Sequence, residues 1–328
     1  YGWGGNSIFA VSLWILARLS QAEVRGSVFL VFAGVIWNLA ITFGLLGIMD
    51  GHMSGHEMLE MPTEVWPAML ISYLIITFLA LVIHRSRQVR ETIAPQWFIL
   101  AALLWFPALF LIAWNGLEIN PARGTLQTVL SMWYGQSLVW LWLTPVALGA
   151  AYYLIPAILG RTIDKYYLAI FGFWCIAALA PWSVVHHLEG GPVPMWIPAV
   201  GTVMSIAMVF PIAVASTNFH ATAFMDIGKV WDSLPLRFVI FGTLSYTVSS
   251  YIGVIFSLPA VAKITQFTII NEFHFNQRVY GFFSMIIFGA VYFALPRITG
   301  REIPKGAKSF HFWTSSLGVL MLLLAYLI

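Results

Sequence analysis

The feature that most constrains this chain is a succession of about ten apolar segments, each about as long as a membrane-spanning helix. A span needs about 20 predominantly apolar residues, and only short linkers separate these segments. We place the segments at residues 1–18, 27–49, 66–84, 93–115, 127–158, 166–188, 195–219, 236–259, 269–297 and 309–328. Backbone inside lipid must pair its polar groups internally, so such segments form helices. The sequence therefore predicts an all-α, polytopic membrane helix bundle, with residues 1–328 forming a single transmembrane domain.

The composition agrees with this class. Of the 328 residues, 60% are hydrophobic and 9% are charged, whereas soluble domains carry about 25% charged residues. So much apolar surface is compatible only with a bilayer environment. The chain has one cysteine, Cys175, which excludes an internal disulfide. A transporter has little support, because no inverted repeat and no matching pair of broken apolar segments is visible.

The basic residues alternate between successive loops. Loops on one side hold Arg18, Arg25, Arg85, Arg87, Arg90, Arg161, Lys165, Lys229, Arg237, Arg297, Arg301, Lys305 and Lys308. The opposite loops hold Arg123 and Lys263, with the acidic residues Asp50, Glu57, Glu60, Glu64, Glu118 and Glu189. Since cytoplasmic loops are enriched in Lys and Arg, we expect the basic side to be cytoplasmic, with loops 84–92, 159–166, 220–236 and 297–308 on it. The net charge of +3 then reflects topology, and nucleic acid is not an expected partner.

Three histidines lie in apolar segments at a similar depth, toward the outer side. His186 and His187 are adjacent in PWSVVHHLEGGP, and His274 lies in NEFHFNQRVYGFF. Ionisable groups inside lipid are costly and usually functional, and imidazole binds haem iron and copper. Adjacent helical residues point about 100° apart, so a shared metal requires either an offset metal or a distorted helix end. Pro181 and the following Gly-Gly-Pro turn permit such a distortion. The alternative is a pair of capping or interfacial histidines.

Longer stretches carry a resemblance. WYGQSLVWLWLTPVALGAAYYLIP, HHL and TQFTIINEFHFNQRVYGFFSMIIFGAVYFALPRITGRE resemble the catalytic subunit of cbb3-type (C-family) haem–copper oxidases over nearly the whole chain. The resemblance implies a twelve-helix bundle of which about helices two to eleven are present here, without the family's first and last helices. It also implies a high-spin haem b3 that faces copper and a low-spin haem b.

Position by position, the resemblance places the family's copper-binding histidine pair at His186 and His187 and its haem b3 ligand at His274. Its third copper ligand, a histidine, corresponds to Gln136, and an amide is a poor copper ligand compared with imidazole. The low-spin haem ligand corresponds to Asn276, which is not a normal axial ligand.

Two further positions follow from the same resemblance. The family's redox tyrosine corresponds to Tyr246, for which packing is the alternative role, and a glutamate six residues beyond it corresponds to Ile252. The other low-spin haem histidine would lie before residue 1. We therefore expect one high-spin haem b at most, on His274, and copper that is absent or substoichiometric.

These departures leave two functions open. The first is a divergent haem–copper oxidase subunit I-like protein of a respiratory electron-transfer complex, with a haem b3-like pocket but impaired low-spin haem and copper sites. The second is a working terminal cytochrome c oxidase, or a nitric oxide reductase, with an altered metal site, in which case the chain is a cytochrome-c oxidase-type oxidoreductase. Both imply other membrane and cytochrome subunits as partners and a multi-pass location in the bacterial inner membrane.

Two other features have alternative interpretations. His52-X3-His56-X3-Glu60 has a spacing that could line one helix face and bind a surface metal, although a solvated acidic loop is the preferred interpretation. Arg278 could pair with a haem propionate or with Glu272.

Overall fold

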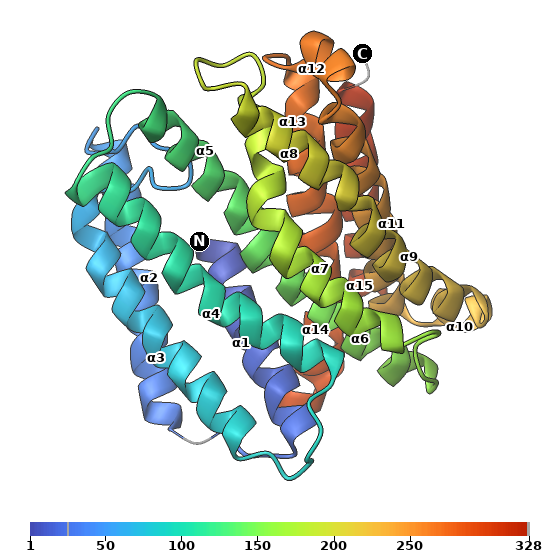
Figure 1. The fold of residues 1–328 in the computed structure, drawn as a ribbon. Coiled ribbons are helices and arrows are strands. Elements are labelled where there is room, and N and C mark those ends of the chain that lie inside the picture. Colours follow the sequence, from blue (N-terminus) through green and yellow to red (C-terminus); the bar gives the residue numbers. More distant parts are fainter. Residues whose placement is uncertain (25, 327–328) are drawn as a thin grey trace.

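The computed structural model describes residues 1–24 and 26–326, and all regular structure in those ranges is helical (Figure 1). The helices are α1 (Gly2–Ser20), α2 (Ser27–Met49), η1 (Thr63–Val65), α3 (Trp66–Arg85), α4 (Ala94–Trp114), η2 (Asn115–Ile119), α5 (Thr125–Leu138), η3 (Val139–Leu143), α6 (Thr144–Leu159), α7 (Tyr167–Ser183), η4 (Val184–Leu188), α8 (Trp196–Ala207), α9 (Val209–Phe224), α10 (Ile227–Asp232), α11 (Leu234–Phe256), α12 (Pro259–Thr265), α13 (Ile269–Asn276), η5 (Gln277–Ser284), α14 (Met285–Thr299) and α15 (Lys305–Ala325). Of these, η1 and η4 are 3₁₀ helices, and η2, η3 and η5 are π-helical.

The predicted helix bundle is confirmed, and the predicted number of spans is close. Within the described residues, eight continuous helical stretches are long and apolar enough to cross a membrane. The first and last predicted segments form α1 and α15, which are not among those eight. Arg25 and residues 327–328, which belong to the predicted basic loops and the last segment, lie outside the described residues.

Hydrogen bonds show which helix ends lie together. Gln88 donates its backbone N–H to Ser20 O at 3.0 Å. Ala94 donates to the Tyr166 hydroxyl at 2.6 Å, which joins the starts of α4 and α7. The end of α6 meets the end of α9 through an ion pair between Arg161 and Asp226 at 3.2 Å.

The last basic loop lies at this same end. Gly289 of α14 packs against the backbone oxygen of Pro235, at the start of α11, so α14 runs toward the basic end and the 297–308 loop follows there. The structure thus gathers the predicted basic loops at one end of the bundle. Two of the helices that end there stop at a glycine in the left-handed region, Gly160 (φ 71°) and Gly300 (φ 68°), a conformation that glycine adopts without steric cost.

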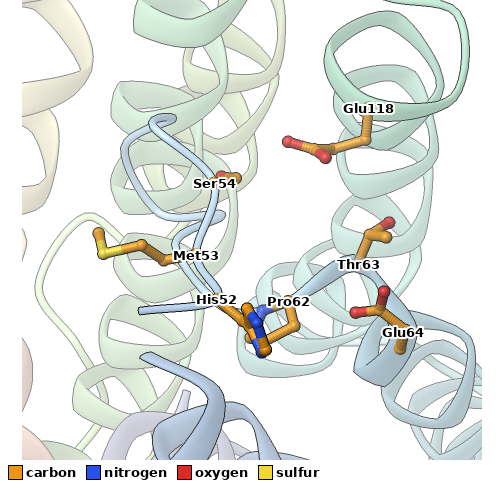
Figure 2. Close-up of a pocket in the computed structure, with 7 residues that line it drawn as sticks. All are labelled: His52, Met53, Ser54, Pro62, Thr63, Glu64 and Glu118. Atoms are coloured by element: carbon orange, nitrogen blue, oxygen red, sulfur yellow. The ribbon is translucent and has the colours of Figure 1, made fainter. Parts of the chain in front are cut away.

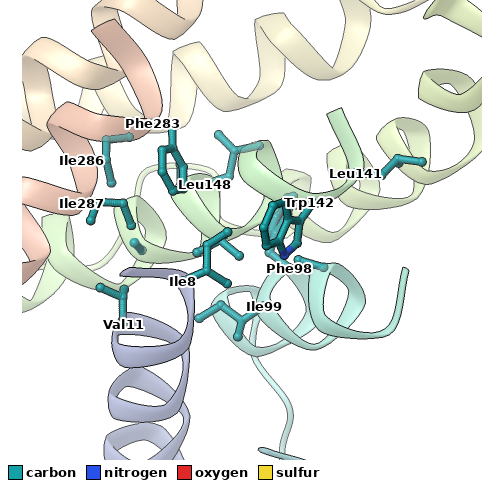
Figure 3. Packing of buried hydrophobic residues seen from close by; sticks show 14 of the residues in the cluster. Ile8, Val11, Phe98, Ile99, Leu141, Trp142, Leu148, Phe283, Ile286 and Ile287 are labelled. Atoms are coloured by element: carbon teal, nitrogen blue, oxygen red, sulfur yellow. The ribbon is translucent and has the colours of Figure 1, made fainter. Parts of the chain in front are cut away.

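Among the described residues, a small hydrophobic cluster of Phe238, Met285 and Phe312 packs α15 against α11 and α14. A much larger hydrophobic core joins most of the helices (Figure 3). Ile8 of α1, Ile99 of α4 and Ile286 of α14 are fully buried in it. In the same core Trp142 of η3 donates its indole N–H to the Tyr73 hydroxyl at 3.0 Å, the kind of partner that a buried indole N–H usually has. This packing fixes η3 and η5, the two π-helical segments that carry part of the site described next.

Candidate functional site

The histidine pair lies where α7 changes from an α-helix to the 3₁₀ helix η4. Pro181 lies within α7, two residues before its end, and proline weakens the α-helical hydrogen bonding around it. The indole N–H of Trp133 in α5 donates to the backbone oxygen of Pro181 at 3.0 Å. On the other side of the pair, Gln266 donates to His187 O at 2.6 Å. Neighbouring elements therefore hold the turn that carries both histidines.

His186 has a defined ring orientation. Its Nδ1 lies 2.6 Å from the backbone oxygen of Ser183 and 2.9 Å from the Ser205 hydroxyl. A carbonyl oxygen only accepts hydrogen bonds, so Nδ1 carries the proton and donates it to Ser183 O. Nε2 of the neutral ring then keeps its lone pair, and it is buried with no hydrogen-bond partner among the described residues.

The three predicted histidines come together. The rings of His186 and His187 are 4.1 Å apart between centroids, and those of His187 and His274 are 5.1 Å apart and nearly parallel, at 4°. His274 is 2% exposed and packs closely against α11, because Gly253 there has no side chain to obstruct its ring.

Arg278 is a buried cation beside these imidazoles. It is 3% exposed and follows His274 by four residues, which places both side chains on one helix face. Its guanidinium lies 3.9 Å from the centroid of the Trp140 ring, an arrangement worth about 2 kcal/mol when desolvated. A buried ion costs several kcal/mol, so this contact offsets only part of the cost.

Of the two partners considered for Arg278, Glu272 does not pair with it. No ion pair within the described residues includes Arg278, and Glu272 is exposed at the start of its helix. Arg278 instead helps to line a small cavity of about 20 Å³, which is room for about one water molecule. The residues that line it are Trp140, Ser183, His186, His187, Ser205, Met208, Ser250, Gly253, Val254, His274 and Arg278.

Gln136 and Tyr246 lie nearby but do not line this cavity. Gln136 is buried in α5. At the neighbouring Gly135, the Glu57 carboxyl group packs against the helix where a side chain would otherwise lie. Tyr246 of α11 is fully buried with its ring 4.8 Å from that of Phe282, and its hydroxyl has no hydrogen-bond partner in the described part of the chain.

Asn276 faces a different cavity, of about 300 Å³. Its amide donates to the Tyr326 hydroxyl at 2.6 Å, which ties α13 to the end of α15. The lining includes Tyr1, Met58, Trp142 and Phe283, and no histidine among the described residues.

The loop after α2 does not place His52, His56 and Glu60 on one helix face, because residues 50–62 have no regular helix. His52 instead lines an open pocket of about 390 Å³ together with Glu64 and Glu118 (Figure 2). Within the described residues, no group of three or more His, Cys, Asp or Glu side chains is arranged to hold a metal ion.

Comparison with known proteins agrees with this fold. The family model for cytochrome c and quinol oxidase polypeptide I matches residues 1–328. The chain belongs to this family. A solved haem–copper terminal oxidase dimer superimposes with a TM-score of 0.77 at 12% identity, over 96% of this chain and 62% of that one, which shows the fold. The predicted resemblance to haem–copper oxidase subunit I is thereby confirmed.

Relatives of known name are distant but similar over nearly the whole chain. A cytochrome c oxidase subunit 1 homolog of Agrobacterium tumefaciens is 26% identical over 98% of this chain and 61% of its own length. The cbb3-type cytochrome c oxidase subunit CcoN1 of Stutzerimonas stutzeri is 26% identical over 98% of this chain and 69% of its own length. The chain thus spans about three fifths to two thirds of these relatives.

The family implies haem and copper, and the histidine cavity is where the resemblance puts the haem b3–copper pair. A ligating nitrogen lies about 2 Å from its metal and paired metals lie about 4 Å apart, so nitrogens on opposite sides of such a pair are about 8 Å apart. The rings of His187 and His274 have centroids only 5.1 Å apart, and Arg278 lines the same cavity. In this arrangement a porphyrin does not fit between them.

Sequence reasoning singled out the three histidines but missed what surrounds them. Trp140, Ser205 and Ser250 line the cavity, yet tryptophan and serine are common in apolar helices and carried no distinct signal. In the sequence, the four-residue spacing between His274 and Arg278 indicated that the two side chains lie on one helix face. No sequence pattern indicated the contact between Glu57 and Gly135, because it joins a loop to a helix distant in sequence.

Proposed function

We propose that this chain is a divergent subunit I-like membrane component of a respiratory electron-transfer complex, in which the family's metal centre is not built in its usual form. The observation that carries the proposal is the pairing of Arg278 with Trp140 at the histidine cavity. A fixed positive charge beside His274 disfavours a bound metal cation. The cavity that Arg278 helps to line is about 20 Å³, which is room for about one water molecule and not for a haem.

The two positions where the family's ligands are replaced, Gln136 and Asn276, support the same conclusion. Gln136 does not line the histidine cavity, so a copper bound there lacks a third protein ligand. Asn276 is engaged with Tyr326 and faces a cavity that no described histidine lines, which leaves a low-spin haem without an imidazole from the residues described.

A working oxygen or nitric oxide reductase is the second candidate function, and His186 favours it. Because Nδ1–H of His186 donates to Ser183 O, Nε2 keeps a lone pair that can bind a metal. Metal-bound histidines are commonly oriented by such a hydrogen bond. The two candidates differ in metal content, and that difference can be measured.

The experiment is a cofactor analysis of the complex purified from membranes. We expect no six-coordinate b-type haem on this chain, measured by the reduced absorption spectrum of the native complex, with the pyridine haemochrome giving the amount of haem. We also expect less than one copper per chain, measured by elemental analysis. His186→Ala and His274→Ala then leave the metal content unchanged, as does the control His311→Ala, whose ring bonds to Tyr292 far from the cavity.

One haem and one tightly held copper per chain, both lost in His186→Ala but retained in His311→Ala, would establish the reductase instead. If one high-spin haem is present without copper, its loss in His274→Ala identifies His274 as the axial ligand, as the resemblance implies.

We also propose that residues 1–328 act as one transmembrane domain in the bacterial inner membrane, with the basic loops in the cytoplasm and with other membrane and cytochrome subunits as partners. The gathering of the basic loops at one end of the bundle supports this topology. In a Cys175→Ser background, single cysteines at Arg87 and Lys305 should react with an impermeant thiol reagent from the same, cytoplasmic side. Labelling of the two from opposite sides would contradict the topology.

A further inference from the structure

A groove on the outside of the bundle, remote from the histidine cavity, carries an inference of its own. It has a volume of about 330 Å³ and lies between α4 and α7, next to the basic end of α3. Its floor is one face of α4, formed by Trp97, Leu100, Ala101, Leu104 and Trp105. These positions repeat at three- and four-residue intervals and so form a continuous stripe. Over eight residues the stripe extends about 12 Å along the helix.

Aromatic side chains of α7 form the facing wall. The ring of Phe173 lies 5.8 Å from both Trp97 and Trp105, and stacks on Trp105 at 6°. Trp174 lies 5.9 Å from Trp97 and is 55% exposed. This apolar channel starts at the membrane-facing surface near the basic end and runs toward the middle of α4, which suits a hydrocarbon chain that enters from the interface.

The end of the groove near the loop is polar and basic. His84 and Thr92 line it. Arg87 is not one of the lining residues, but it donates to His84 O at 3.2 Å, which holds its guanidinium next to His84. Both His84 Nδ1 and Arg87 Nε are buried without a hydrogen-bond partner among the described residues. Buried polar groups are normally paired. An arginine Nε only donates, whereas the role of His84 Nδ1 depends on its tautomer, so Arg87 Nε is the atom that points to a ligand supplying an acceptor.

The charge balance specifies that ligand further. The segment from His84 to Thr92 contains Arg85, Arg87 and Arg90 against one acidic residue, Glu91. None of these arginines takes part in an ion pair within the described residues. Basic pockets between membrane helices on the cytoplasmic side bind anionic lipid headgroups.

We propose that this groove binds one anionic phospholipid. Its phosphate lies between Arg87, His84 and Thr92, and one acyl chain lies along the stripe from Trp97 to Trp105. A zwitterionic lipid of the same chain length presents the same hydrocarbon but brings a positive charge toward the arginines, so the site discriminates between headgroups. The inference is independent of the metal content of the histidine cavity.

The test is native mass spectrometry of the purified, delipidated complex titrated with phosphatidylglycerol or with phosphatidylcholine of identical acyl chains. We expect one phosphatidylglycerol to bind about tenfold more tightly than phosphatidylcholine. Arg87→Gln should abolish most of that preference, and Ala101→Phe should weaken both lipids by filling the floor. The matched control is Arg161→Gln, which removes an arginine at the same end of the bundle that is already paired with Asp226.

Equal binding of the two lipids to the wild type, or an unchanged preference in Arg87→Gln, would overturn the proposal. A second measurement does not depend on the stability of the variants. A photoreactive benzophenone side chain in place of Trp174, a large and 55% exposed residue of the groove wall, should form an adduct with lipid in the intact complex. An adduct with another subunit at this position would show that a partner helix occupies the groove, and would also overturn the proposal.

Discussion

The close approach of α8 to the histidine turn makes Gly201→Ala a severe substitution. A Cβ atom at Gly201 would lie 2.8 Å from both His186 Cα and the backbone carbonyl carbon of Val185, and closer still to His186 N. These are backbone atoms of η4, so no side-chain rotation relieves the overlap, and α8 and η4 must separate. Overpacking of this kind costs about 1–3 kcal/mol and occasionally more, and here we expect about 3 kcal/mol.

Gly34→Ala is the matched control. Gly34 lies inside α2, and a Cβ there meets nothing within 4 Å. Alanine is favoured over glycine inside a helix by up to about 1 kcal/mol, so this variant should be as stable as the wild type or slightly more stable. The two glycine-to-alanine changes should therefore differ by about 3–4 kcal/mol in the free energy of unfolding.

The assay is thermal unfolding of both variants in the same detergent, with hydrogen exchange of the peptide that covers residues 184–191 as a local measurement. Gly201→Ala should lower the melting temperature by several degrees and speed exchange in this peptide. If Gly201→Ala melts with Gly34→Ala and keeps the wild-type exchange rate, the packing of the histidine turn against α8 is not as described here.

Two further predictions concern charged groups. Partial burial against α5, followed by the negative charges of Glu272 and Glu60, raises the pKa of Glu57 above its ordinary value. The wild type should therefore lose stability as the pH rises through this raised pKa, whereas Glu57→Gln should show no such loss in thermal melts across that range; parallel pH profiles would contradict this. Arg278→Met should leave the melting temperature unchanged or raise it, because replacing a buried charge by an apolar side chain is often neutral or stabilising by about 1–4 kcal/mol. A loss of about 3–5 kcal/mol would instead indicate an ionic partner for Arg278.

The fold was predictable because it depends on hydropathy and charge asymmetry, which are properties of whole segments. The segments from Ser27 to Thr299 became the expected helices within a few residues. The first and last segments were harder, since Gly2–Ser20 and Lys305–Ala325 contain more small and polar residues. These two helices pack against the rest of the bundle, and this tertiary packing stabilises them although their hydropathy alone does not mark them as membrane spans.

The site was predictable only as far as residue type and spacing determine it. Spacing from Pro181 and the glycine turn indicated a distorted helix end at His186 and His187, and the structure has a 3₁₀ helix there. Spacing does not determine how far two helices lie apart, so the 5.1 Å separation of His187 and His274 was not predictable. Nor were the π-helical turns η3 and η5, which depend on one extra residue per turn and which bring Trp140 and Arg278 into contact.

The cavity beside Asn276 allows a last prediction, on what restoring a histidine there achieves. In a protein that consists of residues 1–328, Asn276→His should not produce a six-coordinate low-spin haem. Such a haem needs two axial ligands on opposite faces, and the cavity of about 300 Å³ has no histidine among its described lining residues, so the new imidazole supplies only one. The histidine ring can form a hydrogen bond with the Tyr326 hydroxyl in place of the Asn276 amide. The variant should therefore fold, and a missing haem signal does not reflect misfolding. After reconstitution with haem, the reduced spectrum should lack a sharp α-band.

Met58 lines the same cavity, and a thioether is an established haem ligand. A sharp α-band in Asn276→His that disappears when Met58→Leu is added would therefore refute the prediction and identify the second ligand.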